Sequence, residues 1–265
     1  MPESSVIPIT DVIFEHRLYL PMAGFALFVT TSLYYLFGQK SPKGIITALL
    51  ILTAVYSFLS YQRNSLWKNE LTLWEDTVKK SPNSAQARLH RGLAYVHENR
   101  LDEGIADYTR AIEIEPRFVT AYMDRGLAYA RQGSLDLALA DYNHVIEAKP
   151  RSADAYDNRA AIHAMKGDYE KTIADCTKAI GIDNDLVYAY MNRGRAYLNK
   201  GELDLAIADY NKAIQLDPRD GRLYLDRANA HDLKKEYEES LEDIQRAQAL
   251  GVQASREFVE GVQKR

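Results

Sequence analysis

Five arginines and five aspartates recur through this sequence at one fixed spacing. Each aspartate follows its arginine by sixteen residues, and each arginine lies 34 residues after the one before it. A guanidinium and a carboxylate brought together form a bidentate ion pair, and a row of such groups can also hold a charged ligand. We favour a structural role, in which each pair fixes the register of two helices. The predicted pairs are Arg91–Asp107, Arg125–Asp141, Arg159–Asp175, Arg193–Asp209 and Arg227–Asp243.

The residue types that usually carry catalysis or bind metals show no such pattern. The six histidines and the single cysteine do not have the spacing of a zinc site or of a metalloprotease motif. His163 and His231 occupy a repeat position that elsewhere holds tyrosine, and Cys176 also replaces a tyrosine of sister repeats. Packing is therefore the role we expect for all three. We predict no catalytic residue, no metal site and no cofactor.

The elements that position the charged residues follow the same 34-residue period. Prolines recur at Pro82, Pro116, Pro150 and Pro218, with Asn184 in the remaining place. A small residue recurs in phase with them, at Gly92, Gly126, Ala160, Gly194 and Ala228. This arrangement of small, aromatic and proline residues resembles the tetratricopeptide-repeat (TPR) family, whose unit is a helix–turn–helix.

The resemblance implies an all-α solenoid with five full repeats in residues 85–254. No single helix pair can bury its apolar side alone, so stacking of neighbouring repeats supplies the core. We interpret residues 63–84 as a connector helix and partial repeat, and residues 255–265 as a C-terminal capping helix. The five repeats are 85–118, 119–152, 153–186, 187–220 and 221–254.

Two uncharged apolar runs near the N-terminus are long enough to cross a membrane. They cover residues 18–37 and about 44–61, and a bilayer-spanning helix needs roughly 20 such residues. The sequence predicts a transmembrane helical hairpin within residues 1–62; buried helices of a soluble domain are the less favoured alternative. Lys40 and Lys43 lie in the connection and indicate that it faces the cytoplasm. We therefore expect an integral protein of the bacterial cytoplasmic membrane with its TPR array on the external side.

In the TPR family, ligand contacts come from the first helix of each repeat, on the concave face of the solenoid. The clamp that grips a C-terminal carboxylate needs a lysine where this sequence has leucine, methionine or aspartate, so we do not expect that clamp. The most polar cluster consists of Asn192, Arg195 and Asn199, although a merely solvated face is an open alternative. The residues predicted to bind a protein or peptide are Arg131, Asp157, Asn158, Asn192, Arg195, Asn199 and Asn229. The net charge of −4 argues against nucleic acid.

A second resemblance lies in the first eighty residues. The segments SSVIPITDVIFEHRLYLPMAGF and SLWKNELTLWEDTVKKSPNSA are similar to the C-terminal end of bacterial relatives of the TPR-containing protein O-mannosyltransferases, which are GT-C glycosyltransferases. The catalytic acid of that family lies many spans upstream, so the resemblance implies that the catalytic part is absent here. Glu15, His16 and Arg17 are candidates for contact with a membrane-lipid headgroup; an interfacial charge cluster is the alternative.

Two functions follow from these features. The first is a membrane-anchored TPR scaffold that binds other proteins through the concave face and is not an enzyme. The second is a C-terminal fragment of a GT-C-type protein O-glycosyltransferase, whose TPR array positions acceptor proteins. The identity of the partner and the oligomeric state stay open at this point.

Overall fold

The computed structural model describes residues 31–32, 35, 47, 50–55 and 69–264. The chain divides into two compact units, Met1–Asn69 and Glu70–Arg265, and the helices discussed below all belong to the second. The described residues form helices, turns and bends and contain no strand. The all-α prediction is therefore confirmed for this part of the chain.

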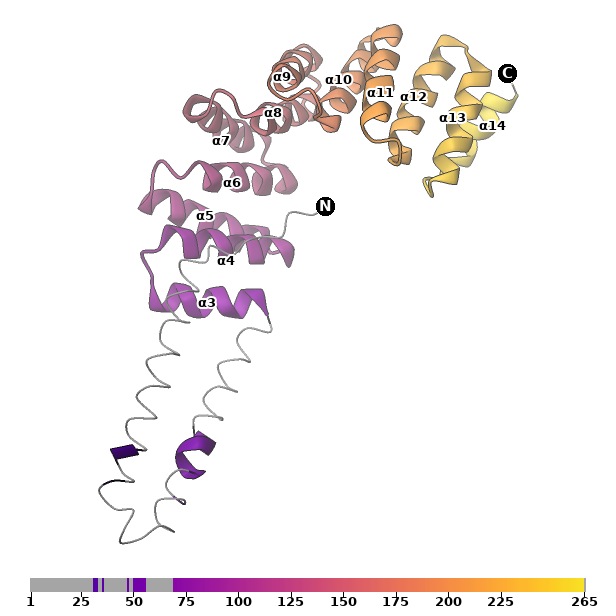
Figure 1. Cartoon of the computed structure of the whole chain (residues 1–265). Helices are drawn as coiled ribbons and strands as arrows, with labels where there is room; N and C mark the ends of the chain where they lie inside the picture. The colour runs from indigo at the N-terminus through magenta and orange to yellow at the C-terminus, as the bar shows by residue number, and fades with distance from the viewer. Residues whose placement is uncertain (1–30, 33–34, 36–46, 48–49, 56–68, 265) are drawn as a thin grey trace. The chain divides into compact units, whose positions relative to one another are not determined.

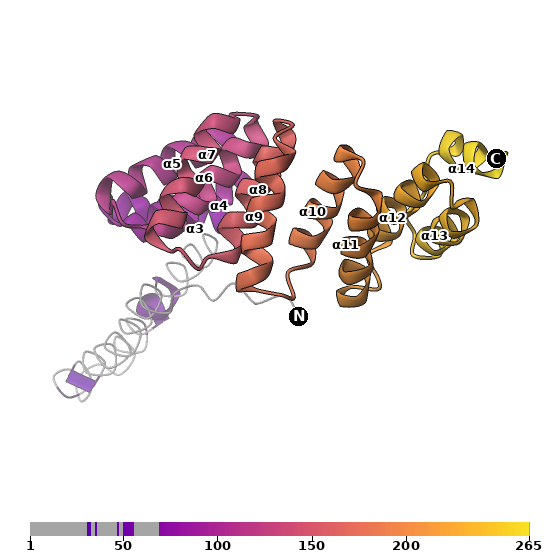
Figure 2. The ribbon, with the colours of Figure 1, turned by 90° about the horizontal axis from the view of Figure 1, so that it is seen from above.

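The second unit is a succession of short helices that stack in chain order (Figure 1). The same order is followed from above in Figure 2. The helices are α3 (Glu70–Lys80), α4 (Ala85–His97), α5 (Leu101–Ile114), α6 (Val119–Gln132), α7 (Leu135–Ala148), α8 (Ala153–Met165), α9 (Tyr169–Ile182), α10 (Val187–Lys200), α11 (Leu203–Leu216), α12 (Gly221–Lys234), α13 (Tyr237–Ala249) and α14 (Arg256–Gln263). We call α4, α6, α8, α10 and α12 the A helices, and α5, α7, α9, α11 and α13 the B helices. Each A helix packs against the B helix that follows it, which confirms an α-solenoid of helix pairs.

Short turns between the A and B helices depend on residues that tolerate a left-handed backbone. Gly133 ends α6 with φ at 84° and Gly201 ends α10 with φ at 78°. Glycine adopts this conformation without the steric penalty of a Cβ atom. The next helix can therefore begin two residues later and fold back against its partner.

The contact inside each helix pair depends on matched side-chain volumes. A Cβ atom added at Gly126 would lie 2.9 Å from the ring of Tyr142, so the glycine makes room for that ring. Gly92 and Gly194 make room for Tyr108 and Tyr210 in the same way. The two repeats that carry alanine instead, Ala160 and Ala228, have the smaller Cys176 and Ile244 in place of tyrosine. A larger side chain on the B helix is thus matched by a smaller residue on the A helix, as close packing requires.

Both ends of the array are covered by a further helix. At the N-terminal end, α3 buries Leu71, Trp74 and Val78 against α4, and the ring of Trp74 stacks on His90 at a centroid distance of 4.4 Å. At the C-terminal end, the Ser255 side chain caps α14 by accepting a hydrogen bond from the backbone of Phe258. The apolar side of α14 packs against α13 and closes the core there.

The membrane prediction needs correction. No helix in the described part of the chain is both long enough and apolar enough to cross a bilayer. The array helices have at most 14 residues, which corresponds to about 21 Å against the roughly 30 Å of a hydrocarbon core. Most of the runs 18–37 and 44–61 lies outside the described residues. The prediction of an integral membrane protein with an external array is therefore wrong on this finding.

Candidate functional site

The structure brings together all five of the arginine–aspartate pairs that the spacing predicted. In the fourth repeat, Arg193 donates from Nε and Nη2 to the two carboxylate oxygens of Asp209, both at 2.8 Å. The other four pairs form the same two bonds at 2.6–2.9 Å. The aspartates are nearly inaccessible, with 4–6% of their surface exposed. Since the arginine comes from an A helix and the aspartate from a B helix, each pair joins the two helices of one repeat.

Each of these arginines from the second repeat onward also reaches back to the preceding repeat. Arg193 Nη1 donates to Thr177 Oγ1 and Arg125 Nη1 donates to Thr109 Oγ1, both at 3.1 Å. The equivalent bonds of Arg159 and Arg227 go to Asn143 and Asn211. Sequence reasoning missed this contact, although its signal is present as a hydrogen-bonding residue sixteen positions before each arginine. The arginine thus connects three helices and links neighbouring repeats as well as the two halves of one.

The guanidinium groups have little capacity left for a ligand. In addition to the hydrogen bonds, Arg193 lies 5.7 Å from the ring centroid of Tyr190, and Arg125 lies 5.4 Å from that of Tyr122. Both oxygens of each aspartate already accept from the arginine, and the hydrogen bond to Asp209 is the main cause that raises the pKa of Arg193. Charge-assisted bidentate pairs of this kind are strong and geometrically specific. This arrangement is suited to holding helices together.

The surface available to a partner is formed by the A helices. Successive A helices contact one another along the whole array, whereas no successive B helices within residues 70–264 are in comparable contact. The array therefore curves with the A helices on its inner side, as expected for a helical solenoid. We call the surface made by Asp124, Leu127, Arg131 and their equivalents on α8, α10 and α12 the A face.

The most polar predicted cluster is tied up by bonds within the chain. Asn192 donates to Asp157 Oδ1 on the neighbouring A helix at 2.9 Å. Arg195 donates to Asp226 Oδ2 at 2.8 Å, also across two A helices. Asn199 donates to the backbone carbonyl of Arg195 at 2.8 Å. The structure therefore directs these three side chains to three different acceptors and does not join them into one polar site.

The remaining predicted binding residues are distributed along the A face. Arg131 donates weakly, at 3.4 Å, to the carbonyl of Val96 and to Asn99 on the preceding repeat. Asn158 lies against the sulfur of Met123 at 3.5 Å. Asn229 is exposed on α12. These residues lie on the surface that the sequence assigned to them, but they form a row along several repeats.

Three carboxylates on the A face lie in an environment that disfavours their charge. Burial raises the pKa of Asp124 to about 6, and burial also raises the pKa of Asp157 and of Asp226. Hydrogen bonding or ion pairing partly offsets burial for Asp157 and Asp226, whereas burial is the sole cause for Asp124. Asp124 occupies a first-helix position that contacts ligands in the TPR family, but the sequence alone does not indicate its burial, because that depends on side chains from neighbouring repeats.

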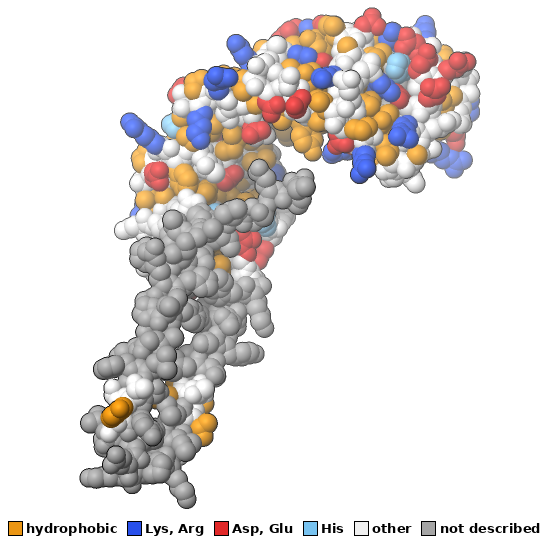
Figure 3. Space-filling view, in the orientation of Figure 1, with side chains coloured by type: hydrophobic (Ala, Val, Ile, Leu, Met, Phe, Trp, Pro, Cys, Tyr) orange, Lys and Arg blue, Asp and Glu red, His pale blue; other side chains and the backbone are white. Residues whose placement is uncertain are grey.

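Apolar side chains lie on the same surface between the polar ones. Leu127, Met165 and Leu233 come from three A helices and remain 47%, 62% and 54% exposed. The space-filling view shows hydrophobic side chains interspersed with acidic and basic ones over the face of the array that it presents (Figure 3). Leu137 and Leu205 on B helices are exposed to a similar extent, at 51% and 48%, so these apolar side chains alone do not distinguish the A face.

The described residues offer no arrangement suited to catalysis by a metal or a thiolate. No group of three or more His, Cys, Asp or Glu side chains in this part of the chain could hold a metal ion. Cys176 is fully buried, and burial raises the pKa of its thiol. Burial lowers the pKa of His163, which packs inside its repeat. The proposed headgroup contacts Glu15, His16 and Arg17 lie outside the described residues.

Three stretches of the chain match the family described as tetratricopeptide repeat: residues 94–163, 153–186 and 187–220. The chain is also similar to Protein O-mannosyl-transferase Tmtc3 of Drosophila melanogaster, with 27% identity over 43% of this chain and 13% of that protein. Protein O-mannosyl-transferase tmtc2 of Xenopus laevis is 33% identical over 38% of this chain and 12% of its own length. This chain thus spans about an eighth of the length of these relatives.

Solved structures with the same fold include MamA, which superposes with a TM-score of 0.56 at 23% identity and covers 60% of this chain and 94% of its own. YrrB, described as a TPR protein with an unusual peptide-binding site, gives a TM-score of 0.58 at 17% identity, with 72% of this chain and 98% of that chain covered. PilF of Pseudomonas aeruginosa gives 0.62 at 17% identity, with 68% and 83% covered. At these identities the likeness shows the fold alone.

Proposed function

Because residues 94–220 consist of tetratricopeptide repeats, we propose that this chain is an interaction scaffold whose A face binds a segment of another protein. One observation carries the proposal. The A helices form the inner side of the array, and Leu127, Met165 and Leu233 remain exposed there beside half-buried carboxylates. YrrB has a peptide-binding site and the same fold, which supports a peptide-like ligand here.

The proposed contacts run along the A face from α6 to α12. They are Arg131, Asp157, Asn158, Asn192, Arg195, Asn199 and Asn229. Several of these side chains already bond to one another, so a partner exchanges existing hydrogen bonds for new ones. That exchange favours specificity over tight binding, because the net gain of each replaced hydrogen bond is small.

The division of the array into five repeats belongs to the same proposal. Residues 85–254 supply the repeats, residues 63–84 precede them as a partial repeat, and residues 255–265 cover the C-terminal end. The first helix of each repeat begins 34 residues after the first helix of the preceding repeat. These helices begin at Ala85, Val119, Ala153, Val187 and Gly221. The arginine–aspartate pairs fix the register of the helices in this scheme and do not bind the partner.

A scaffold role also accounts for the chemistry of the array without an active site. Cys176 is inaccessible, and its thiol is held in the protonated form by burial. We propose that the chain has no enzymatic activity of its own. Its neighbours among solved structures are TPR proteins, which fits this proposal.

Crosslinking from two matched leucines tests the scaffold proposal. Leu127 on α6 is 47% exposed on the A face, and Leu137 on α7 is 51% exposed on the B helix of the same repeat. A photoreactive benzoylphenylalanine replaces each in turn in the full-length protein inside cells. We expect a specific crosslinked protein from position 127 and none from position 137. Equal crosslinking from both positions, or none from position 127, would refute the proposal.

The similarity to protein O-mannosyl-transferases favours a second candidate function. In this alternative the array positions acceptor proteins for sugar transfer by a catalytic part that lies elsewhere. Mass spectrometry of the species crosslinked through position 127 separates the two candidates. Proteins that carry O-linked mannose, or a glycosyltransferase subunit, support the alternative, and unglycosylated proteins alone contradict it.

A further inference from the structure

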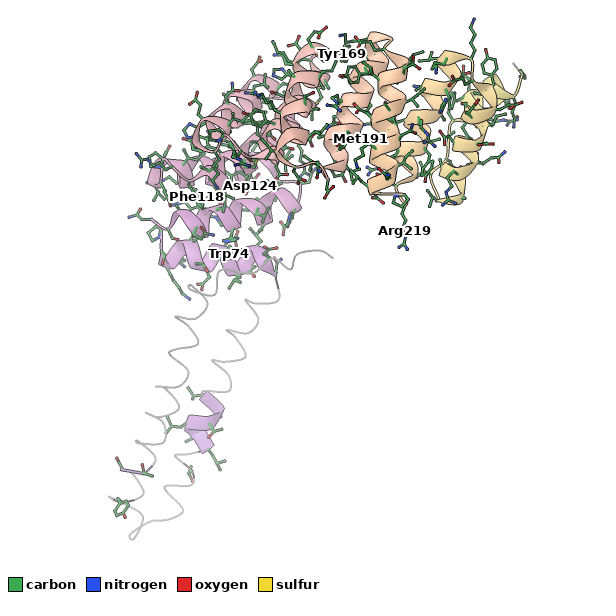
Figure 4. All side chains as sticks on the ribbon, turned by 45° about the horizontal axis from the view of Figure 1, so that its top comes forward. Trp74, Phe118, Asp124, Tyr169, Met191 and Arg219 are labelled. Carbon is green, nitrogen blue, oxygen red and sulfur yellow. The ribbon has the colours of Figure 1, made fainter. Side chains whose placement is uncertain are left out.

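Asp124 stands apart from the other buried and half-buried aspartates of residues 70–264 because nothing in the described chain neutralises it. It lies on the A face of α6, where Figure 4 labels it, and makes no hydrogen bond or ion pair with any described residue. Its carboxylate is half-buried, which costs free energy unless a partner compensates. The structural aspartates avoid this cost through arginine, and Asp157 reduces it through Asn192.

Two buried phenols accompany this carboxylate. Tyr108 on α5 and Tyr142 on α7 are each 1% exposed, and the charge of Asp124 is among the causes that raise the pKa of both. Neither hydroxyl forms a hydrogen bond with a described residue. Neither phenol O–H donates to Asp124, so the carboxylate has no hydrogen-bond donor in the described part of the chain.

The same position in the fifth repeat shows what is missing. Asp226 occupies the place of Asp124 three repeats later, and there Arg195 of the preceding repeat forms an ion pair with it at 2.8 Å. Arg195 lies 31 residues before its aspartate, and the residue 31 before Asp124 is Leu93. The chain therefore supplies a guanidinium to Asp226, whereas the equivalent residue for Asp124 is an apolar leucine.

We propose that Asp124 is the binding site for a lysine or arginine side chain of the partner segment. This inference rests on the proposed function and specifies the chemistry of the partner. The exposed Leu127 and the neighbouring Met123 contact the aliphatic stem of the incoming side chain, because both lie within one turn of Asp124. Asp154 and Asp157 on the next A helix extend the preference for positive charge along the segment.

Binding of a cationic probe tests the inference. The probe is fluorescein-labelled octalysine amide. Its affinity for the full 265-residue chain is measured by fluorescence anisotropy at physiological salt. Octa-(Nε-acetyl-lysine) serves as the uncharged comparison. The variant Asp124→Asn keeps the shape of the side chain and removes its charge. Glu242→Gln is the matched control, because it removes one charge from an exposed position on a B helix. We expect about a tenfold loss of octalysine affinity for Asp124→Asn, as for a lost hydrogen-bonded charge contact, and less than a twofold loss for the control.

A second variant shows whether a loss of binding in Asp124→Asn comes from the lost charge or from altered folding. Leu93→Arg provides Asp124 with the internal guanidinium that Asp226 already has, and we expect it to reduce octalysine binding about as much as Asp124→Asn does. Octalysine affinity equal in Asp124→Asn and Glu242→Gln would overturn the inference. The scaffold proposal would survive that result if crosslinking through position 127 persisted, and it would fail separately if that crosslinking were absent.

Discussion

The second and the fifth repeats solve the same packing problem with different residues. In the helix contact, the second repeat pairs Gly126 with Tyr142, and the fifth pairs Ala228 with Ile244. On the A face, both carry a half-buried aspartate, but only the fifth repeat receives an arginine from its neighbour. In the core, the change in one residue is matched by the change in the other, whereas the exchange on the A face leaves one carboxylate uncompensated. Variation in the core is therefore compensated inside the repeat, whereas variation on the A face is not, and we propose that a partner compensates it.

Both repeats contain an arginine–aspartate pair. Removal of one partner of such a pair has the largest effect on stability that we expect. Replacement of Arg193 by alanine leaves Asp209 buried without its partner, and the cost of such a loss is about 3–5 kcal/mol. We expect Arg193→Ala and Asp209→Ala together to cost clearly less than the sum of the two single changes. Chemical denaturation of the four proteins gives the coupling energy, and strict additivity would contradict a direct pair.

Replacement of Asp124 should raise the stability of the folded protein, whereas replacement of Arg193 lowers it. Burial raises its pKa to about 6, so between about pH 4 and pH 6 the folded protein holds this proton more tightly than the unfolded chain does. The stability contributed by the protonated form is present at pH 4 and is lost as the pH rises through 6. We expect Asp124→Asn to stabilise the protein by on the order of 2 kcal/mol at pH 7 and hardly at all at pH 4.

The matched variant for this measurement is Asp226→Asn. Burial also raises the pKa of Asp226, but the charge of Arg195 lowers it again. The gain at pH 7 should therefore be smaller for Asp226→Asn than for Asp124→Asn. Denaturation midpoints at pH 4 and pH 7 check both variants. A destabilised Asp124→Asn protein at pH 7 would show that the carboxylate has a partner after all.

The core difference between the two repeats predicts a smaller effect. A methyl group at position 126 would approach the ring of Tyr142 to 2.9 Å, so Gly126→Ala should destabilise the array by about 1–3 kcal/mol through overpacking. The double variant Gly126→Ala, Tyr142→Ile reproduces the pair found in the fifth repeat and should recover much of this loss. Thermal denaturation compares the stability of the single and the double variant. A double variant less stable than the single one would contradict the claim that the smaller isoleucine makes room for the alanine.

The sequence predicted those features that repeat, and it failed for features that depend on contact between repeats. The spacing of Arg193 and Asp209 is constant, so two antiparallel helices bring such pairs together wherever the period holds. Asp124 has Leu93 of the preceding repeat at the position where Asp226 has Arg195, and no single-repeat motif contains both residues. The apolar runs 18–37 and 44–61 were judged by length and composition alone, and the membrane localisation inferred from them did not hold.

The smallest expected effect comes from removal of the arginine that distinguishes the fifth repeat. Arg195 is 44% exposed, so its pair with Asp226 is screened by solvent and Arg195→Leu should cost no more than about 1 kcal/mol of stability. The same change leaves Asp226 in the situation of Asp124, since leucine is the residue that stands at position 93. Octalysine should then perturb the amide NMR signal of Asp226 in Arg195→Leu and leave it nearly unaffected in the unaltered protein. If that signal responds equally in both proteins, the arginine does not occupy the cation site, and the contrast between the two repeats has another cause.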